Sequence, residues 1–318
     1  MARRPTRIVV FSGTAHLELA ADICKRLRVK LSPSTITRFS NDCLGAQLEA
    51  NCREADVYII QPLSPPVQEH LMELLLMLDA ARGASAARIT AVIPHYAYAR
   101  SDKKDAPRIS IAARLVADLL ATAGANRVLT MTLHSAQVHG FFGVPCDHMN
   151  AFDVIARHFR RRDLRNTIVV SPDLGNAKAA SHLARILKLP VAAGSKQRLG
   201  DDKVVIDDIV GDVDGRNVIV IDDEIANGGT IVEVLRKLRE RRVGRIAVAC
   251  THGLFTGKAI ERLRAQRDVE EIVTTNTVPI SREKRLPNMR VLSIAPLLAE
   301  TIRRIHMGES VSALFRSL

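Results

Sequence analysis

The sequence predicts an α/β protein with two domains, each built around a parallel sheet with helices on both faces. Short apolar runs alternate with amphipathic helical stretches along the whole chain. Its 318 residues are enough for two separate cores. Residues 150–166 form a basic helical stretch without a strand, and a fresh strand–loop–helix series follows it. We therefore predict domains at 1–150 and 151–318.

Strand candidates are short apolar runs bounded by polar residues. In chain order they are 8–11, 57–61, 89–93, 127–132, 167–171, 218–221, 246–251, 271–275 and 291–294. Helix candidates lie between them and carry apolar residues every three or four positions. They are 15–27, 68–82, 109–123, 177–187 and 230–241.

The composition argues against nucleic acid as a partner. The formal net charge is +12, but the basic residues are dispersed, with the densest cluster at 157–165. Aromatic residues make up 3% and Trp is absent, so a stacking surface for single strands is not expected. A solvated basic face, or attraction of phosphorylated small molecules, explains the charge better.

Cysteine usage and hydropathy predict a cytoplasmic protein without membrane segments. The five cysteines have an odd total and no CxxC spacing, which favours reduced thiols over disulfides or a zinc site. The apolar run 71–78 is interrupted by Glu73 and is too short to span a bilayer. The basic start of the chain precedes an apolar run only a strand long, so no signal peptide is expected.

The segment VIVIDDEIANGGTI, residues 218–231, is the first candidate site. In open parallel sheets, ligands collect where loops leave the carboxyl ends of strands. The apolar run places Asp222 and Asp223 at such an end. Gly228 and Gly229 permit close backbone approach, and Thr230 begins a helix whose free N–H groups favour an anion. The alternative is a plain helix cap, for which two adjacent acids are more than is needed.

Four further loops could join this site. They are SPDLGNAK at 171–178, YARSDKKD at 98–105, TLHSAQ at 132–137 and SKQRLGDD at 195–202. The first repeats the strand, acid, glycine and helix order, and the second could hold a polyphosphate. The last carries Lys196 and Arg198, which could close over a phosphate site as a mobile cationic lid. Taken singly, the four loops have simpler interpretations, in the same order: a capping turn, a solvated charge run, a loop with a structural histidine, and a surface turn.

Together the loops resemble those of the ribose-phosphate diphosphokinase family, also called phosphoribosyl pyrophosphate synthetases. The matching segments cover nearly the whole chain in the family's order: IVVFSGTAH, RFSN, AVIPHYAYARSDKKD, LHSAQVHGFFGVPCD, VVSPDLGNAKAA, SKQR, VGDVDGRNVIVIDDE, THGLFTG, VTTNT and LAETIRRIHMGESVSALF. The resemblance implies that each domain has a type I phosphoribosyltransferase-like fold. It places the ribose 5-phosphate loop and the C-terminal helix in the second domain. It also implies ATP and magnesium as requirements, and a homo-oligomer, a hexamer or its dimers.

The resemblance also implies roles for individual residues. The reaction would move the β,γ-diphosphoryl group of ATP onto the 1-hydroxyl of ribose 5-phosphate, mainly by positioning and neutralising phosphates. The positions matched to adenine binding, donated to a neighbouring subunit, are Phe39 and Asn41; those matched to ATP are Arg100, Asp102 and Lys103; and those matched to the metal–ATP complex are His134 and Asp173. The positions matched to the transferring phosphates are Lys196 and Arg198. Those matched to the ribose hydroxyls are Asp222 and Asp223, and those matched to the 5-phosphate are Asn227, Gly228, Gly229 and Thr230.

Six positions depart from the family pattern. Ala226 and Asn227 stand where Asp and Thr are expected, and Thr132 replaces an acid beside the metal position. The others are Cys43 for Glu, Ser101 for Gln and Ala179 for Arg. Asn227 keeps an amide donor, but Ala226 cannot replace a carboxylate, and a neutral Thr132 should weaken magnesium binding.

The sequence therefore supports two functions from different classes. The first is an enzyme that makes 5-phosphoribosyl 1-diphosphate, favoured by the retained cations and acids. The second is a catalytically weak paralogue that binds and regulates an active homologue, in a mixed oligomer, favoured by Ala226, Thr132 and Cys43. A kinase of the same fold acting on another sugar phosphate is a third alternative.

Overall fold

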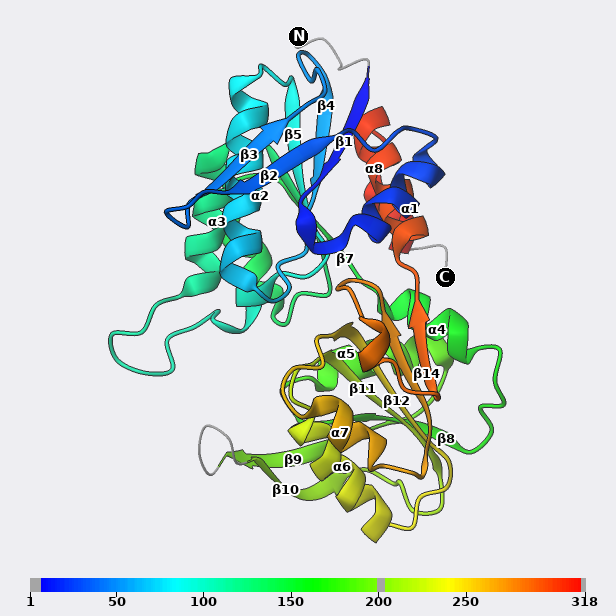
Figure 1. Ribbon diagram of the computed structural model, residues 1–318. Coiled ribbons are helices and arrows are strands. Elements are labelled where there is room, and N and C mark those ends of the chain that lie inside the picture. Colours follow the sequence, from blue (N-terminus) through cyan, green and yellow to red (C-terminus); the bar gives the residue numbers. More distant parts are fainter. Residues whose placement is uncertain (1–6, 199–203, 316–318) are drawn as a thin grey trace. The chain divides into compact units, whose positions relative to one another are not determined.

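The computed structural model describes residues 7–198 and 204–315 (Figure 1). The chain forms two compact units. The N-terminal unit comprises Met1–Met149, Thr277–Pro279 and Ile294–Leu318. The C-terminal unit comprises Asn150–Asn276 and Ile280–Ser293. The two-domain α/β class predicted from the alternation of strands and helices is confirmed.

The N-terminal unit is built on a five-stranded parallel sheet in the order β1-β4-β5-β6-β7. Its strands are β1 (Ile8–Ser12), β4 (Asp56–Ile60), β5 (Arg88–Ile93), β6 (Arg127–Met131) and β7 (Cys146–Met149). Its helices are α1 (Leu17–Leu27), α2 (Val67–Gly83), α3 (Ala112–Ala123) and α8 (Ala295–Met307). Alternate strand residues pack against α2 and α3 on one face, as Phe11 and Ile59 do against Leu74. Helices α1 and α8 pack together on the other face (Figure 1).

Helix α8 belongs to the N-terminal unit, so placing the C-terminal helix in the second domain was wrong. A buried charge network holds it there. Asp56 is fully buried at the start of β4, pairs with Arg88, and accepts hydrogen bonds from Tyr58 at 2.9 Å. His306 of α8 lies 2.9 Å from the same carboxylate, and Tyr58 and Arg88 also donate to backbone carbonyls of α8. Because these residues are far apart in the sequence, no local sequence pattern predicts this network.

An antiparallel hairpin of β2 (Ser34–Arg38) and β3 (Leu44–Leu48) was not predicted as strands. Its residues lack the apolar runs of the other strands, because one side of the hairpin is exposed. The inner side packs Ile36, Ala46 and Leu48 against the same core as α2.

The C-terminal unit has a seven-stranded sheet in the order β10-β9-β8-β11-β12-β13-β14. Its strands are β8 (Thr167–Ser171), β9 (Val191–Arg198), β10 (Val204–Val210), β11 (Asn217–Ile225), β12 (Ile246–Gly253), β13 (Val269–Thr275) and β14 (Met289–Leu292). All neighbours are parallel except β9 and β10, which form an antiparallel pair. The parallel strands therefore end at one common edge.

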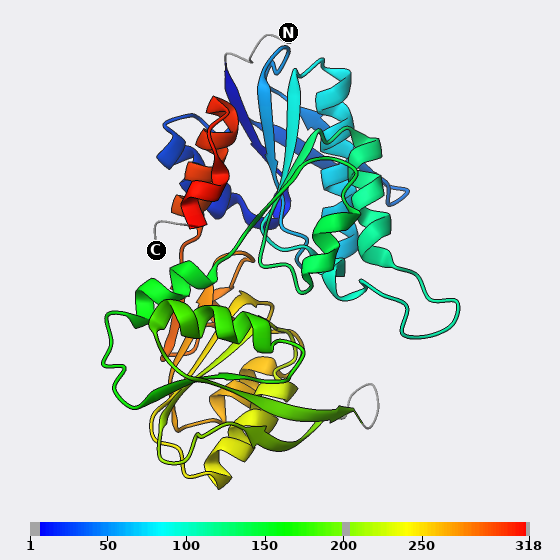
Figure 2. The ribbon, with the colours of Figure 1, turned by 180° about the vertical axis from the view of Figure 1, so that it is seen from behind.

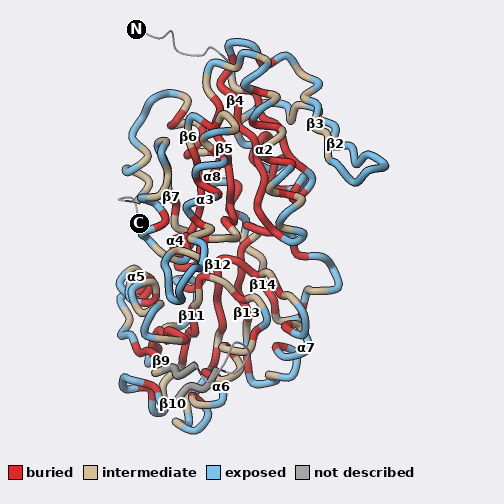
Figure 3. The backbone as a smooth tube through the Cα atoms, turned by 90° about the vertical axis from the view of Figure 1, so that its left-hand side faces the viewer, coloured by how far each residue is buried: buried red, intermediate tan, exposed pale blue. Residues whose placement is uncertain are grey.

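Helices cover both faces of this sheet (Figures 1 and 2). Helices α4 (Phe152–Phe159) and α5 (Ala177–Leu187) pack on the face that carries Ile219 and Ile221. Helices α6 (Gly229–Glu240) and α7 (Ala259–Arg264) pack on the face that carries Val218 and Val220. Figure 3 shows that buried residues follow the strands, whereas the loops at the strand ends are largely half-buried or exposed. The buried strands thus form a rigid base for loops that stay accessible.

Two bulk predictions can be compared with the structure. All five cysteines are free thiols. Among the residues that the structure describes, no helix has both the length and the apolarity needed to cross a bilayer.

Candidate active site

Asp222 and Asp223 lie at the carboxyl edge of the C-terminal sheet, but inside β11 rather than beyond it. The predicted strand ended at residue 221, whereas β11 continues to Ile225. It does so because β12 also continues and pairs Asp222 with Cys250 and Ile225 with Gly253. On its other side β11 pairs with β8 only as far as Val220. Asp222 and Asp223 therefore border the loop that follows β8.

That loop carries Asp173 and brings it next to the two acids. Asn176 donates from Nδ2 to Asp222 Oδ1 at 2.8 Å and to Asp223 Oδ1 at 3.5 Å. The Asp173 carboxylate accepts the backbone N–H of Asn176 at 2.9 Å. Asp222 also accepts the N–H of Asp223 at 2.9 Å. One asparagine thus links the two predicted loops 171–178 and 222–230 into a single oxygen-rich cluster.

The turn after these acids leads into the N-terminus of α6. Gly228 has φ +75°, a left-handed conformation that glycine adopts without strain, and its carbonyl accepts the N–H of Val232. The Asn227 side chain caps the turn, because its Oδ1 accepts the N–H of Gly229 at 2.9 Å. One of the N–H groups predicted to face a phosphate is therefore occupied by the side chain of Asn227.

Arg262 of α7 adds positive charge to this turn. Its Nη1 donates to the backbone oxygen of Asn227 at 2.9 Å. A Cβ placed on Gly229 would lie 3.6 Å from the same nitrogen. The guanidinium and the positive end of α6 thus lie at one place, where an anion would be stabilised.

The predicted ATP residues of the N-terminal unit lie after β5. Arg100 ends a short 3₁₀ helix, Ala97–Arg100, and Asp102 and Lys103 follow it. Arg100 and Lys103 are exposed. Ser101 closes the following loop, since its Oγ donates to the backbone oxygen of Ser110 at 3.0 Å and accepts the N–H of Ala112 at 3.1 Å. The loop that carries the cations is therefore closed at its base where α3 begins.

Phe39 and Asn41 lie at the tip of the β2–β3 hairpin. Phe39 is 54% exposed, which is unusual for an aromatic side chain in a chain with few of them. Asn41 accepts the N–H of Cys43 through Oδ1 at 3.2 Å, and Asp42 has φ +68°. The hairpin thus presents an exposed ring on a turn held by its own polar residues.

His134 is exposed on the loop after β6. Two backbone contacts hold the residues before it: Thr132 N–H donates to Met149 O at 2.8 Å, and Leu133 N–H donates to His148 Nε2 at 2.9 Å. Thr132 has φ +42°, which strains a β-branched residue. Burial, and to a smaller extent the His139 ring, lower the pKa of His148 from 6.5 to about 4. His148 is therefore neutral near pH 7, as an acceptor must be.

The lowered pKa of His148 predicts a pH dependence of stability. The folded state disfavours protonated His148, so this contribution is fully present above pH 6.5 and is lost as the pH falls towards 4. Between pH 7 and pH 5 we expect this residue to account for about 1–2 kcal/mol of the loss in unfolding free energy. Urea unfolding of wild type and His148→Gln at both pH values measures it. An equal loss in both proteins would contradict the assignment.

Lys196 and Arg198 occupy the last part of β9, where they pair in register with Ile206 and Val204 of β10. Their side chains lie outside the described part of the structure, as do residues 199–203. The sequence indicated a polar surface turn here, and the backbone up to residue 198 is instead a strand. The strand had no apolar period because it lies at the outer end of a two-stranded extension.

The predicted residues thus form one group in each unit. The C-terminal unit brings together Asp173, Asp222 and Asp223, with the α6 N-terminus directly after them in the chain. The N-terminal unit carries Arg100, Asp102, Lys103 and His134 on loops after β5 and β6. Within residues 7–198 and 204–315, no cluster of three or more His, Cys, Asp or Glu side chains forms a ready metal cage.

Three residues that sequence reasoning missed contact the predicted loops. They are Asn176, His148 and Arg262. Asn176 had a signal, because it stands three residues after Asp173 at a helix start, where Asn is a common cap. Arg262 lies 35 residues from Asn227, and no local pattern relates the two.

Comparison with known proteins identifies the family. The family model described as the N-terminal domain of ribose phosphate pyrophosphokinase matches residues 8–124, and the model of the phosphoribosyl synthetase-associated domain matches residues 201–316. A Streptomyces coelicolor protein described as a putative ribose-phosphate pyrophosphokinase is 63% identical over 308 residues, covering 97% of each chain. The chain belongs to the ribose-phosphate pyrophosphokinase family.

Other members of the ribose-phosphate pyrophosphokinase family agree in length and fold. The Deinococcus radiodurans ribose-phosphate pyrophosphokinase is 49% identical, over 99% of this chain and 100% of that one. The crystal structure of phosphoribosylpyrophosphate synthetase from Mycobacterium smegmatis matches with a TM-score of 0.90 and 40% identity. That match covers 95% of this chain and 100% of the other. The predicted family and its two-unit α/β architecture are therefore confirmed.

This member of the ribose-phosphate pyrophosphokinase family uses several of its departing residues structurally. Ser101 closes the loop before α3, and the Cys43 carbonyl accepts the Phe39 N–H at 2.8 Å in the hairpin turn. Ala179 packs half-buried against the core on the α5 side. The Ala226 backbone oxygen accepts the N–H of Thr256 at 2.9 Å, and its methyl side chain has no polar group. Ala226 and Thr132 therefore remain the departures with the clearest chemical cost.

Proposed function

We propose that the protein catalyses ATP- and magnesium-dependent transfer of diphosphate to the 1-hydroxyl of ribose 5-phosphate, giving 5-phosphoribosyl 1-diphosphate. The observation that carries the proposal is the cluster of Asp222, Asp223 and Asn176 at the carboxyl edge of the sheet, followed directly by the glycine turn and α6. Family membership supports the same reaction. Hydroxyl-binding acids followed by an anion site are what a phosphorylated sugar requires.

In this proposal the sugar phosphate spans the segment from β11 to α6. Asp222 and Asp223 accept hydrogen bonds from the ribose hydroxyls. The 5-phosphate accepts hydrogen bonds from the backbone N–H groups of the turn that runs from Asn227 through Thr230, and Arg262 adds positive charge beside them. Because Asn227 Oδ1 already accepts the Gly229 N–H, its carboxamide must rotate away or turn Nδ2 towards the phosphate. Losing that hydrogen bond costs about 1 kcal/mol, or roughly fivefold in affinity.

The transfer itself needs cations rather than covalent help. The 1-oxygen of the sugar bonds to the β-phosphorus of ATP and loses its proton, while the bond from that phosphorus to the oxygen of the α-phosphate breaks and AMP leaves. Lys196 and Arg198 neutralise the transferring phosphates, and Arg100, Asp102 and Lys103 hold ATP. Phe39 and Asn41 bind adenine in a neighbouring subunit. Positioned cations are the main source of rate in phosphoryl transfer.

Oxygen-rich side chains near the sugar suit magnesium. Magnesium is usually held by one or two carboxylates together with substrate phosphates and water, and an all-protein cage is not required. Asp173 in the C-terminal unit and His134 in the N-terminal unit are the residues that match positions associated with the metal–ATP complex. Magnesium supplies charge neutralisation on the phosphates. Thr132 offers only a neutral hydroxyl, so we propose weaker magnesium binding than a carboxylate there would give.

One observation favours the second candidate, a weak paralogue that regulates an active homologue. Asn227 occupies an N–H group of the phosphate turn, and the neighbouring Ala226 has no carboxylate. Both changes fall in one loop, which would reduce sugar-phosphate binding without disturbing β11 or α6. Cys43 on the hairpin and Thr132 at the metal position add to this alternative.

Restoring the loop separates the two candidates. Ala226→Asp with Asn227→Thr is expected to lower the dissociation constant for ribose 5-phosphate by about tenfold, because a carboxylate and an uncapped N–H return. Adding Thr132→Asp should lower the magnesium concentration needed for half-maximal turnover. Calorimetry and turnover of each variant measure these effects, with Ala265→Asp on the exposed end of α7 as the matched control.

The outcomes of this series differ clearly. If wild type binds ribose 5-phosphate and turns over as well as the restored protein, the departures are harmless and the regulatory alternative loses its support. If neither protein binds ribose 5-phosphate, the proposed reaction fails.

We also propose a homo-oligomer, a hexamer or its dimers, in which the hairpin bearing Phe39 and Asn41 completes a neighbour's ATP site. An exposed aromatic ring on a turn fits contact with another chain. Phe39→Ala is expected to raise the KM for ATP by about tenfold and to leave the fold intact. Light scattering, with and without an added homologue, detects homo- or mixed oligomers. A fully active monomer contradicts this assembly.

A further inference from the structure

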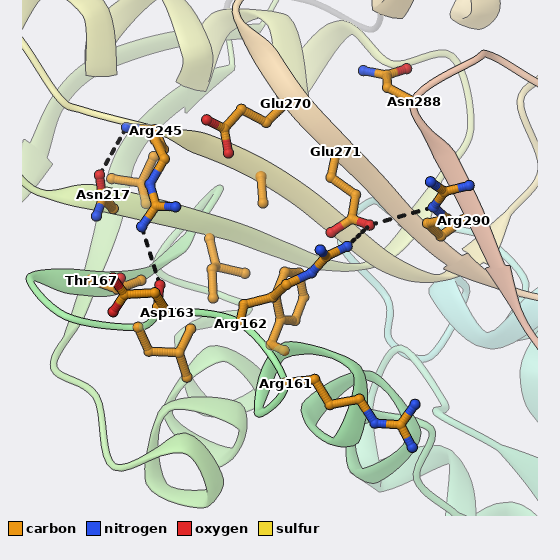
Figure 4. Close-up of a pocket in the computed structure, with 15 residues that line it drawn as sticks. Arg161, Arg162, Asp163, Thr167, Asn217, Arg245, Glu270, Glu271, Asn288 and Arg290 are labelled. Atoms are coloured by element: carbon orange, nitrogen blue, oxygen red, sulfur yellow. Dashed lines mark hydrogen bonds and ion pairs between the residues drawn. The ribbon is translucent and has the colours of Figure 1, made fainter.

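A cavity of about 490 Å³ opens at the opposite edge of the C-terminal sheet from the candidate active site (Figure 4). Its walls come from the end of α4 and the stretch after it, and from the amino-terminal ends of β8, β11, β12, β13 and β14. Its volume falls in the range of small-molecule sites, about 300–1,000 Å³. The short helix α4 ends at Phe159 and leaves this part of the sheet face uncovered.

The cavity is separate from the sugar-phosphate loop. Strand β11 lines it with Asn217, Val218 and Ile219 and carries Asp222 further along. Five residues from Asn217 to Asp222 correspond to roughly 17 Å of extended strand. A ligand in the cavity would therefore not contact the groups proposed to hold ribose 5-phosphate.

Four arginines and three carboxylates line the cavity: Arg161, Arg162, Arg245 and Arg290, with Asp163, Glu270 and Glu271. Glu271 accepts ion pairs from Arg162 at 2.8 Å and Arg290 at 3.8 Å, so two guanidinium groups share one carboxylate (Figure 4). Arg245 donates from Nη2 to the backbone oxygen of Asp163 at 3.2 Å, and its positive charge also helps to lower the pKa of the Asp163 carboxylate. The Asp163 carboxylate is engaged by Arg165, whose hydrogen bonds hold its pKa well below the usual range.

The rest of the lining divides into an apolar floor and a polar rim. Phe159, Leu164 and Ala247 form much of the floor. Glu270 and Asn288 lie along the other rim, where the Glu270 side chain is not joined by an ion pair to the labelled neighbours in Figure 4. Arg161 extends away from the centre of the group (Figure 4). The cavity thus offers cations at two sides, an apolar floor, and acceptors on the rim.

We propose that this cavity binds a nucleoside phosphate, with the phosphate between Arg162 and Arg245 and the base on the apolar floor. The excess of guanidinium groups favours a phosphate, for which Arg geometry is well suited. The floor buries one face of a base, and Glu270 and Asn288 accept its amino hydrogens. A purely inorganic anion would leave the floor unused, and an uncharged nucleoside would form no ion pair with the guanidinium groups. This inference does not depend on the reaction proposed above.

Photolabelling with 8-azido-AMP tests the site, because peptide mapping tells it apart from any nucleotide bound at the proposed ATP loops. Labelled peptides are expected to contain residues 159–164, 245–247 or 270–271. AMP should compete with the label at these peptides at least tenfold better than adenosine or inorganic phosphate. The Arg162→Gln, Arg245→Gln double variant should weaken labelling there about tenfold or more. The matched control is Arg264→Gln, Arg267→Gln on the same unit.

The design remains decisive if the arginine variant does not fold. Ala247→Met fills the floor of the cavity without changing charge, and it should abolish labelling of the same peptides while the melting temperature stays near that of wild type. Labelling confined to peptides with residues 39–43 or 98–105 overturns the proposal. So does equal competition by inorganic phosphate, or labelling at the cavity that both Ala247→Met and the arginine variant leave unchanged.

Discussion

Replacing both Lys196 and Arg198 with Ala is expected to lower the rate of diphosphoryl transfer by about 10³–10⁵-fold. The transferring group carries negative charge, and a positioned cation acts most strongly in the transition state. The melting temperature should stay within about 2 °C of wild type, because both residues stand at the outer end of the β9–β10 pair. Turnover and thermal unfolding of the same preparation measure both effects.

The matched control is Arg236→Ala, Lys237→Ala on α6, which removes two cations from exposed ion pairs of the same unit. It should keep turnover within about twofold, since such pairs contribute little. Unchanged turnover in the Lys196 and Arg198 variant would remove these residues from the proposed mechanism. A large loss of stability would show that they serve the fold.

The second large effect is expected for Asp222→Asn with Asp223→Asn. Each substitution removes a charged hydrogen-bond acceptor, which costs about 1.5–3 kcal/mol of binding free energy. Turnover with ribose 5-phosphate should therefore fall by roughly 10²–10⁴-fold. The carboxamide oxygens can still accept from Asn176 Nδ2, which limits the structural cost. We expect ribose 5-phosphate binding by calorimetry to weaken together with turnover, whereas binding of ATP should change little.

Glu233→Gln with Glu240→Gln on α6 serves as the control for this variant, because it neutralises two acids of the same unit that pair with Arg236 at the surface. Wild-type binding of ribose 5-phosphate by the Asp222 and Asp223 variant would show that these acids do not hold the sugar. Loss of binding in the control as well would point to a general effect of charge.

The strands of both parallel sheets were predictable where apolar runs were complete. Thr167–Ser171 agrees with the prediction at both ends because all five residues are buried. The predicted end of β11 was four residues early, since Asp-Asp resembles the start of a loop while β12 continues to pair with it. The β2–β3 hairpin escaped prediction because the exposed residues of β2 are Thr35, Thr37 and Arg38, which leave no apolar run. Burial of one strand face is needed before periodicity shows a strand.

Contacts between residues far apart in the sequence could not be predicted, either within the site or in the assignment of helices to the two units. The acids of β11 and Asp173 were predicted from local patterns and lie together, but the link through Asn176 is visible only in the structure. The cap by Asn227 Oδ1 also depends on the turn's conformation, and it changes what the loop can offer a phosphate. Helix α8 was assigned to the wrong unit because its buried partner, Asp56, stands 250 residues away from His306.

The most direct test of the central claim is turnover by the purified chain alone. ATP, magnesium and ribose 5-phosphate are supplied, and AMP and 5-phosphoribosyl 1-diphosphate are quantified by chromatography and phosphorus NMR. The account predicts equal amounts of both products, with none when ribose 5-phosphate or magnesium is left out. Absence of both products from the chain alone, together with a changed rate when an active homologue is added, would contradict it and identify the chain as a regulator.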